Sequence, residues 1–150
     1  MTILLTNAFS DLVIKKETSN IAYVTNQLHT EAEGRHQMPK VEELAYTAYD
    51  EQNKVVAGIV GYLMYGSLLV DILWVNKRYR GQGYGKRLIQ NLEQEAAQKG
   101  AKFSILLAMS FWENLEFYKK QGYVIISTQE GFSNGAKQYL LRKNLQRVVS

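Results

Sequence analysis

The apolar residues of this chain follow strand and helix patterns in turn, and the sharpest change of pattern falls near its middle. Residues 68–75 form an almost unbroken apolar run rich in β-branched side chains, which predicts a buried strand. From residue 88 to residue 96 the apolar positions recur at helical spacing instead, and Gly100 marks the expected end of that helix. A strand, a connecting loop and a helix are therefore predicted in succession.

Two more strands are predicted before this run. Residues 44–49 and 54–65 have strand-like patterns on either side of the polar turn 50–53, so we expect three antiparallel strands joined by short hairpins. Gly58 and Gly61 lie inside the second segment, where glycine indicates a bulge or the close approach of another backbone.

The beginning of the chain has a weaker pattern. Apolar alternation within residues 11–16 predicts a short strand. A helix with one apolar face is expected to start after the polar residues 18–20 and to end at Gly34. Residues 36–43 contain the only proline and are expected to form a loop or a short helix.

The segment after the central helix begins with an apolar run. Residues 102–108 predict a strand parallel to residues 68–75, because a strand, a helix and a strand in succession favour a crossover connection. Ser110 and Glu113 have the spacing of a capping box, which predicts a helix from there to near Gly122.

Two final strands, at 123–128 and 137–142, are separated by a turn at 131–135 that contains glycine. The order of elements predicts an α/β (α+β) fold with a mixed, mostly antiparallel central sheet flanked by helices. The sequence contains no repeat or low-complexity linker, so we expect a single domain over residues 1–150.

Composition narrows the classes of protein to consider. The chain has no cysteine, which excludes a disulfide framework and a thiolate metal site, and we expect no metal. Residues 1–6 have no basic leader, and their apolar run is too short for a signal peptide or a membrane span. We therefore expect a cytoplasmic protein that does not associate with membranes.

The net charge of +4 hides an asymmetry between the two halves. Residues 1–75 hold 5 Lys and Arg against 9 Asp and Glu, and residues 76–150 hold 13 against 5. A basic half is typical of nucleic-acid binding, but no zinc-finger spacing or aromatic-interleaved basic stripe accompanies it, so no nucleic acid is expected. A polyphosphate ligand on the second half and a cationic acceptor near the first half explain the asymmetry more economically.

The loop between the central strand and helix holds three glycines and five cationic residues within residues 75–87. Alternating glycines let backbone N–H groups approach a ligand, and a helix N-terminus adds unpaired donors with a partial positive charge. The pattern favours an anion-binding site, although a tight turn that needs positive φ also requires glycine.

Two well-known phosphate loops do not fit this segment. A Walker A loop needs glycine in place of Arg80 and serine or threonine in place of Arg87. A dinucleotide-binding fingerprint that starts at Gly81 needs a glycine in place of Lys86.

The pattern that fits is Arg80-x-x-Gly83-x-Gly85 after a strand that ends at Val75. It resembles the loop that binds the acyl-CoA pyrophosphate in the GNAT superfamily of N-acetyltransferases. A second signature, Phe-Tyr-Lys-Lys-Gln-Gly-Tyr at residues 117–123, resembles the end of the last helix in the same superfamily. Together the two motifs and their flanking strands place the resemblance over residues 68–143.

The resemblance has one departure. Superfamily members often have asparagine seven residues before the tyrosine of the second signature and a small residue four before it, where this chain has Phe111 and Asn114. Asn114 is kept as a candidate contact to the cofactor.

The resemblance implies that the chain uses acetyl-CoA. The cosubstrate would lie between the strand ending at Val75 and the strand starting near residue 102, and the Val75 amide would polarise the thioester carbonyl. The implied cofactor-binding residues are Leu73, Val75, Arg80, Gly81, Gln82, Gly83, Tyr84, Gly85, Lys86 and Asn114.

Tyr118 is the implied catalytic residue, as proton donor to the leaving thiolate; the alternative is an aromatic residue that only fills the core. A free phenol titrates near ~10 and a thiol near ~8.5, so complete proton transfer is uphill. We expect Tyr118 to donate a hydrogen bond, with transfer late or incomplete. The general base is left open among Asp71, Glu31, Glu33, His36 and a water relay.

The predicted function is transfer of an acetyl group from acetyl-CoA to a primary amine by direct attack in a ternary complex. The lack of cysteine argues against a thiol-linked acyl-enzyme, and a serine intermediate is left open. The alternatives are a non-catalytic acyl-CoA-binding regulatory module and a nucleic-acid-binding domain. The acceptor is a small-molecule, peptide or protein amine that the sequence does not identify. The edge strands of a small mixed sheet are compatible with a homodimer.

Overall fold

The structure is a computed structural model that describes residues 12–145 of the chain. The chain divides into two compact units, residues 1–37 and residues 38–150. Among the described residues, no helix has the length and hydropathy to span a membrane. That the two units belong to one domain stays a prediction.

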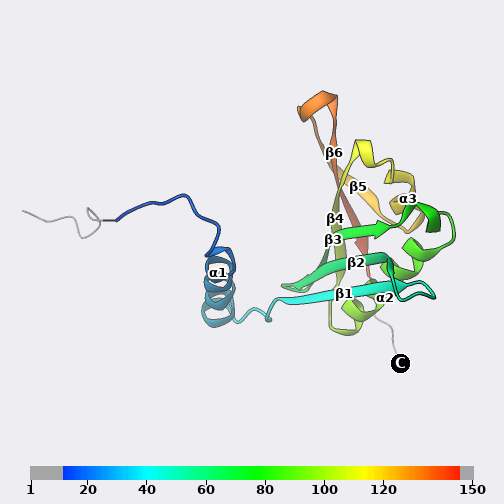
Figure 1. Cartoon of the computed structure of the whole chain (residues 1–150). Coiled ribbons are helices and arrows are strands. Elements are labelled where there is room, and N and C mark those ends of the chain that lie inside the picture. The colour runs from blue at the N-terminus through cyan, green and yellow to red at the C-terminus, as the bar shows by residue number, and fades with distance from the viewer. Residues whose placement is uncertain (1–11, 146–150) are drawn as a thin grey trace, which may run out of the picture. The chain divides into compact units, whose positions relative to one another are not determined.

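Within residues 12–37, the first unit has one helix, α1 (Ile21–His36), preceded by irregular chain at 12–17 (Figure 1). The strand predicted at 11–16 is wrong for residues 12–16, and residue 11 lies outside the described residues. A strand needs a neighbouring strand to satisfy its backbone groups, and the described part of this unit offers none.

The helix α1 does not end at Gly34 as predicted. It continues to His36, and Gln37 takes the left-handed conformation at φ 54°, with its N–H bonded to the carbonyl oxygen of Ala32. Gly34 therefore remains helical, and the end of the helix is set two residues later. No residue of α1 is buried.

The described residues of the second unit form a six-stranded sheet with strand order β1-β2-β3-β4-β6-β5 (Figure 1). The β3–β4 pair is parallel, and the other neighbouring pairs are antiparallel, so the predicted mixed, mostly antiparallel sheet is confirmed. The strands are β1 (Glu42–Tyr49), β2 (Val55–Met64), β3 (Ser67–Val75), β4 (Phe103–Met109), β5 (Val124–Gln129) and β6 (Gln138–Asn144).

The helix α2 (Tyr84–Gln98) packs against β1, β2 and β3. Its side chains Ile89 and Leu92 are fully buried in one core with apolar residues of these strands. Burial of each such side chain stabilises the fold by about 1.5–3 kcal/mol. The helix ends as predicted, because Gly100 takes φ 96°.

The second helix of this unit, α3 (Leu115–Lys120), begins later than its predicted capping box. Ser110 instead starts a 3-10 turn, η2 (Ser110–Trp112), and its Oγ accepts a hydrogen bond of 3.0 Å from the N–H of Lys137. Glu113 then takes a left-handed φ of 53°, and Asn114 becomes the N-cap. The serine hydroxyl is occupied by a residue distant in sequence, so the local capping spacing is overridden.

The prediction of a close backbone approach inside β2 is confirmed at Gly61. A Cβ atom there would lie 2.8 Å from the carbonyl oxygen of Leu69, and the β2–β3 register shifts between Val60 and Gly61. At Gly58 the nearest atom, the carbonyl oxygen of Tyr46, would lie at an ordinary 3.5 Å.

These two glycines give a matched test of packing. We expect Gly61→Ala to lower the free energy of unfolding by about 1–3 kcal/mol, because the added methyl group meets a rigid carbonyl. Gly58→Ala should be close to neutral, since its methyl group fits. Urea denaturation of both variants measures the difference, and equal stabilities would contradict it.

Candidate functional site

The strands β3 and β4, at the centre of the sheet, are paired over only part of their length. They pair only from Ser67 with Phe103 to Val70 with Leu106. β3 continues to Val75 and β4 to Met109 without further pairing between them. A gap therefore opens between two strands that run in the same direction.

The residue at which this gap begins is Asp71. In the β2–β3 ladder, Val60 pairs with Ile72 while Gly61 pairs with Val70, which leaves Asp71 as an extra residue of β3. An extra residue bends the strand that carries it and increases its twist. The bulge thus coincides with the end of the β3–β4 ladder.

Beyond the bulge, β3 presents backbone groups to the gap. The N–H of Asn76 donates to the carbonyl oxygen of Val56 at 2.7 Å, in register with the pairing of Val75 to Ala57. Because bonded and non-bonded pairs alternate along an antiparallel ladder, the N–H and C=O groups of Val75 and Leu73 point away from β2. Both residues are among those that the resemblance implies for cofactor binding.

The loop after β3 is closed by its own arginine. The Nε of Arg80 donates a 2.9 Å hydrogen bond to the carbonyl oxygen of Val75, so the motif arginine ties the loop to the end of the strand. Asn76 supports the same turn, because its Oδ1 accepts from the N–H of Arg78 at 3.0 Å.

The glycines of the loop leave the start of α2 open. Gly81 and Gly83 take φ of 74° and 87°, and neither would have an atom within 4 Å of an added Cβ. Gly83 is the N-cap of α2 and has no side chain to cap it, and no side chain bonds the amides there. The amides of Tyr84, Gly85 and the following residue are orphan donors of a first helical turn, and they fit a diphosphate.

Gly85 brings the two sequence signatures into contact. A Cβ at this position would lie 3.3 Å from the Cζ of Phe117 and 3.7 Å from the Cγ2 of Val75. The absence of a side chain lets the ring of Phe117, on α3, lie against the first turn of α2 and the end of β3. Loop, strand and α3 therefore meet at one point.

Tyr118 lies next to this contact and is buried, with 6% of its surface exposed. Its ring packs edge-on against Phe117, with centroids 5.2 Å apart, and against Tyr123, at 6.0 Å. Burial raises the pKa of the Tyr118 phenol above its ordinary value. The hydroxyl is thus held protonated and suits hydrogen-bond donation better than full proton loss.

Asn114 has the only buried side-chain oxygen or nitrogen atom without a hydrogen-bond partner in the described part of the chain, its Oδ1. The residue is the N-cap of α3, yet its side chain makes no capping bond. Buried polar atoms are nearly always paired, so this acceptor is available to a donor on a ligand. It is an independent reason to keep Asn114 among the candidates.

The remaining predicted site residues are more exposed. The Nε2 of Gln82 donates to the carbonyl oxygen of Arg78 at 3.3 Å, and the ring of Tyr84 packs edge-on against Tyr79 at 6.0 Å. Lys86 is exposed on the first turn of α2. Of the candidate bases, Glu31, Glu33 and His36 belong to the first unit, and Asp71 alone lies in the unit that holds the gap.

A grouping that the sequence interpretation missed contains Tyr62, Glu43 and Asp71, on the first three strands of the sheet. Tyr62 pairs with Glu43 across β1 and β2, and the charge of Glu43 is the main cause that raises the pKa of Tyr62, with a smaller contribution from Asp71. The register of three strands brings these residues together, and no local motif marks them. Within residues 12–145, no group of three or more His, Asp or Glu side chains is placed to hold a metal ion.

Comparisons with known proteins bear on the family of this chain. Residues 42–125 match the family model of the acetyltransferase (GNAT) domain. The chain is 30% identical over 105 residues to the blasticidin-S acetyltransferase of Streptomyces morookaense, which covers 70% of this chain and 77% of that protein. It is 30% identical over 101 residues to the acetyltransferase Atu2258 of Agrobacterium fabrum, covering 67% of this chain and 73% of that protein.

A solved structure shows the same architecture. The crystal structure of an acetyltransferase from Bacillus cereus superimposes with a TM-score of 0.74 and 28% identity. The match covers 89% of this chain and 98% of that one.

The burial of Tyr118 predicts a pH dependence of stability. A phenol in the unfolded chain ionises near ~10, while burial raises the pKa of Tyr118 in the folded chain. Its contribution to stability is present below pH ~10 and is lost as the pH rises through the folded pKa. Between pH 8 and 11, the difference in free energy of unfolding between the wild type and Tyr118→Phe should shrink above pH ~10. Parallel curves in urea denaturation would contradict the raised pKa.

Proposed function

Because this chain belongs to the GNAT acetyltransferase family, whose members take the acetyl group from acetyl-CoA, we propose that it acetylates a primary amine by direct attack in a ternary complex. The observation that carries the proposal is that Gly85 of the glycine loop lies against both Val75, at the end of β3, and the ring of Phe117, which packs against Tyr118. The family assignment favours an enzyme over the non-catalytic module considered from the sequence.

The residues around the gap fit acetyl-CoA as the acyl donor. The backbone groups of Leu73 bind the amide-containing arm in place of a neighbouring strand, the N–H of Val75 lies at the thioester end of that arm, and the open amides from Gly83 to Lys86 bind the diphosphate. The buried Oδ1 of Asn114 accepts a hydrogen bond from the same arm. Bound acetyl-CoA supplies an activated thioester, so no acyl-enzyme intermediate is needed.

Two groups of this chain act at the reacting atoms. The N–H of Val75 polarises the thioester carbonyl, an oxyanion-hole role in which one lost side-chain donor typically costs ~3 kcal/mol. Tyr118 holds its proton at the phenolic oxygen and donates a hydrogen bond to the leaving sulfur. The raised pKa of Tyr118 opposes full transfer, so stabilisation of the developing thiolate is its main contribution.

The acceptor is a primary amine that arrives protonated and has to lose a proton before attack. Asp71 lies where the β3–β4 ladder ends, and Glu43 lies near it beside Tyr62, so carboxylates are available on this part of the sheet to attract a cationic amine. Asp71 is the candidate base that shares a unit with the gap, and a water relay is the alternative.

A small-molecule acceptor is favoured by the relative that acts on blasticidin S. A homodimer stays a prediction.

The proposed role of Tyr118 predicts a kinetic signature. With an accepted amine, Tyr118→Phe should lower kcat on the order of 10²-fold while the KM for acetyl-CoA changes little, because the hydroxyl acts only on the developing thiolate. Thiol release from acetyl-CoA across a panel of amines, blasticidin S included, measures this. Tyr49→Phe, a change at an exposed tyrosine of β1, serves as control. Unchanged turnover in Tyr118→Phe would show that Tyr118 is not the hydrogen-bond donor. If no amine in the panel causes thiol release, the proposed amine acceptor is wrong.

The glycine loop predicts a ligand-dependent difference between two equally strained variants. Gly83 and Gly131 take φ of 87° and 91° in open space, so alanine at either should cost about 1–2 kcal/mol of stability. Coenzyme A at 100 times its Kd should stabilise the wild type and Gly131→Ala by about 2.7 kcal/mol. Gly83→Ala should gain clearly less, because its amides are displaced. Equal thermal shifts for both variants would refute the loop as the diphosphate site.

A further inference from the structure

Tyr123 ends the second sequence signature, and acetyl transfer as described above makes no use of it. Its side chain is one of the largest that are fully buried in the described residues, with 2% exposed. Its hydroxyl lies 2.8 Å from Oε1 of Glu93 and 2.8 Å from Oγ of Ser104. A phenol has one proton, so Tyr123 donates to the carboxylate and accepts from the serine.

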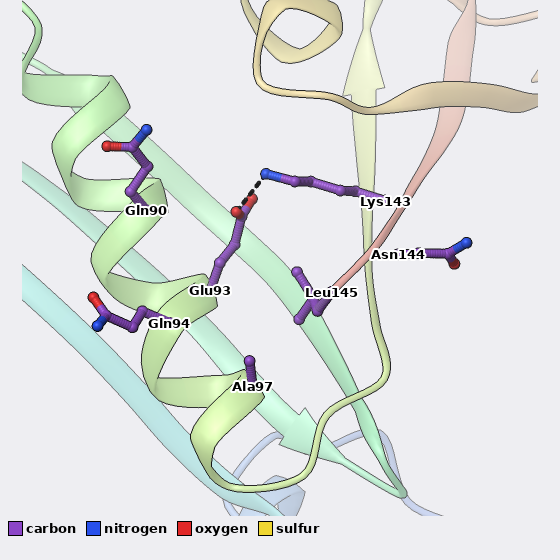
Figure 2. A pocket seen from close by; sticks show the side chains of 7 residues that line it. All are labelled: Gln90, Glu93, Gln94, Ala97, Lys143, Asn144 and Leu145. Carbon is purple, nitrogen blue, oxygen red and sulfur yellow. Dashed lines mark hydrogen bonds and ion pairs between the residues drawn. The ribbon is translucent and has the colours of Figure 1, made fainter. Parts of the chain in front are cut away.

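Glu93 in turn is fixed from a second direction. It lies on α2 with 7% of its surface exposed, and its Oε2 is 2.6 Å from Nζ of Lys143 on β6. Figure 2 shows Glu93 and Lys143 pointing toward each other from α2 and β6. These four side chains, Glu93, Ser104, Tyr123 and Lys143, are called the Glu93 network below. It joins α2, β4 and β6 at the residue that precedes β5.

Tyr123 is also coupled to Tyr118 through the end of α3. Gly122 takes φ 97°, its N–H donates to the carbonyl oxygen of Lys119 at 3.0 Å, and the N–H of Tyr123 donates to that of Tyr118 at 3.1 Å. These two bonds form a Schellman motif. An apolar contact between the first and last residues of the motif, here Tyr118 and Tyr123, frequently accompanies it. Here that contact is the edge-to-face packing of the two tyrosine rings, at an interplanar angle of 74°.

We propose that Tyr123 is a positioning residue for acetyl transfer, because the Glu93 network anchors the ring against which Tyr118 is packed. The inference rests on the proposed role of Tyr118. Phe117 flanks Tyr118 as well, at 5.2 Å, and is placed by its contact with Gly85. The phenol is thus held between a ring placed by the glycine loop and a ring placed by the network.

The hydroxyl of Tyr123 is the part that can be removed alone. Tyr123→Phe keeps the ring contact with Tyr118 and the Schellman bonds, but it releases the ring from Glu93 and Ser104. Turnover in thiol release should fall about tenfold, with little change in the KM for acetyl-CoA, because the donor hydroxyl becomes less well oriented. Tyr46→Phe is the matched control, since it removes a tyrosine-to-glutamate bond of 2.5 Å to Glu95 on the same helix, and it should retain turnover.

A double-mutant cycle separates positioning from a general loss of structure. If Tyr123 acts through Tyr118, Tyr123→Phe should have no further effect on turnover in a Tyr118→Phe background. An equal fold-loss in both backgrounds would overturn the proposal, because it would show an effect that bypasses Tyr118.

A spectroscopic readout tests the inference independently of activity. In protein labelled with 3-fluorotyrosine, the ¹⁹F signal of Tyr118 is assigned as the one lost in Tyr118→Phe. We expect that signal to shift or broaden in Tyr123→Phe and to stay in place in Tyr46→Phe. An unmoved signal in Tyr123→Phe would overturn the proposal. If no amine is acetylated, the proposed function fails while this measurement still decides whether the network positions Tyr118.

Discussion

The parting of β3 and β4 after Val70 and Leu106 is the constraint on which the rest of the site depends. Two adjacent parallel strands would normally bond along their whole length, and a buried backbone group left unpaired costs about 1–3 kcal/mol. At the end of β3 this cost is reduced, because Arg80 donates a hydrogen bond to the carbonyl oxygen of Val75. β4 keeps its bonds to β6 as far as Met109. The groups that remain unpaired form an edge that can bind a peptide-like ligand.

The two sides of this gap differ in how tightly they are packed. The loop before α2 is open, with glycines that leave space for a ligand and helix amides without side-chain caps. The segment at α3 is closed, with Tyr118 and Tyr123 buried and their rings in contact. In the proposed reaction, an open anion site would adapt to a flexible phosphate chain, whereas Tyr118, acting on one sulfur atom, would have to be held in one place. Gly85 joins the two sides, because a Cβ atom there would lie 3.3 Å from the ring of Phe117, closer than an ordinary contact.

The helix α2 contacts both sides, at Gly85 and at Glu93, and tyrosine hydroxyls bond it at Glu93 and at Glu95. Tyr46 on β1 bonds Glu95, a bond that lowers the pKa of the glutamate and raises that of the phenol. Tyr123 bonds Glu93, whose buried charge is compensated by Lys143. A buried charge of this kind adds little net stability, because desolvation offsets the attraction. Its effect is to specify one arrangement of α2 against the strands.

The sequence alone determined the order and type of nearly all elements in residues 42–144, because the apolar period of each segment is a local property. It also determined the two motifs, since the glycine spacing at residues 81–85 and the Phe-Tyr pair at 117–118 can be recognised without knowledge of the fold. Local pattern failed where a distant partner intervened: the hydroxyl of Ser110 bonds the backbone of Lys137, so it caps no helix.

Only the tertiary structure decided where β3 and β4 separate and what holds Tyr118. The residues from Asp71 to Val75 continue the same strand pattern as those before them, and nothing in that pattern marks the end of a ladder. Tyr123 belongs to the second motif, but nothing in that motif indicates its bond to Glu93, which lies 30 residues away along the chain. Periodicity encodes which face of an element is buried, but hydrogen bonds and charges between elements depend on distances that arise only when the chain has folded.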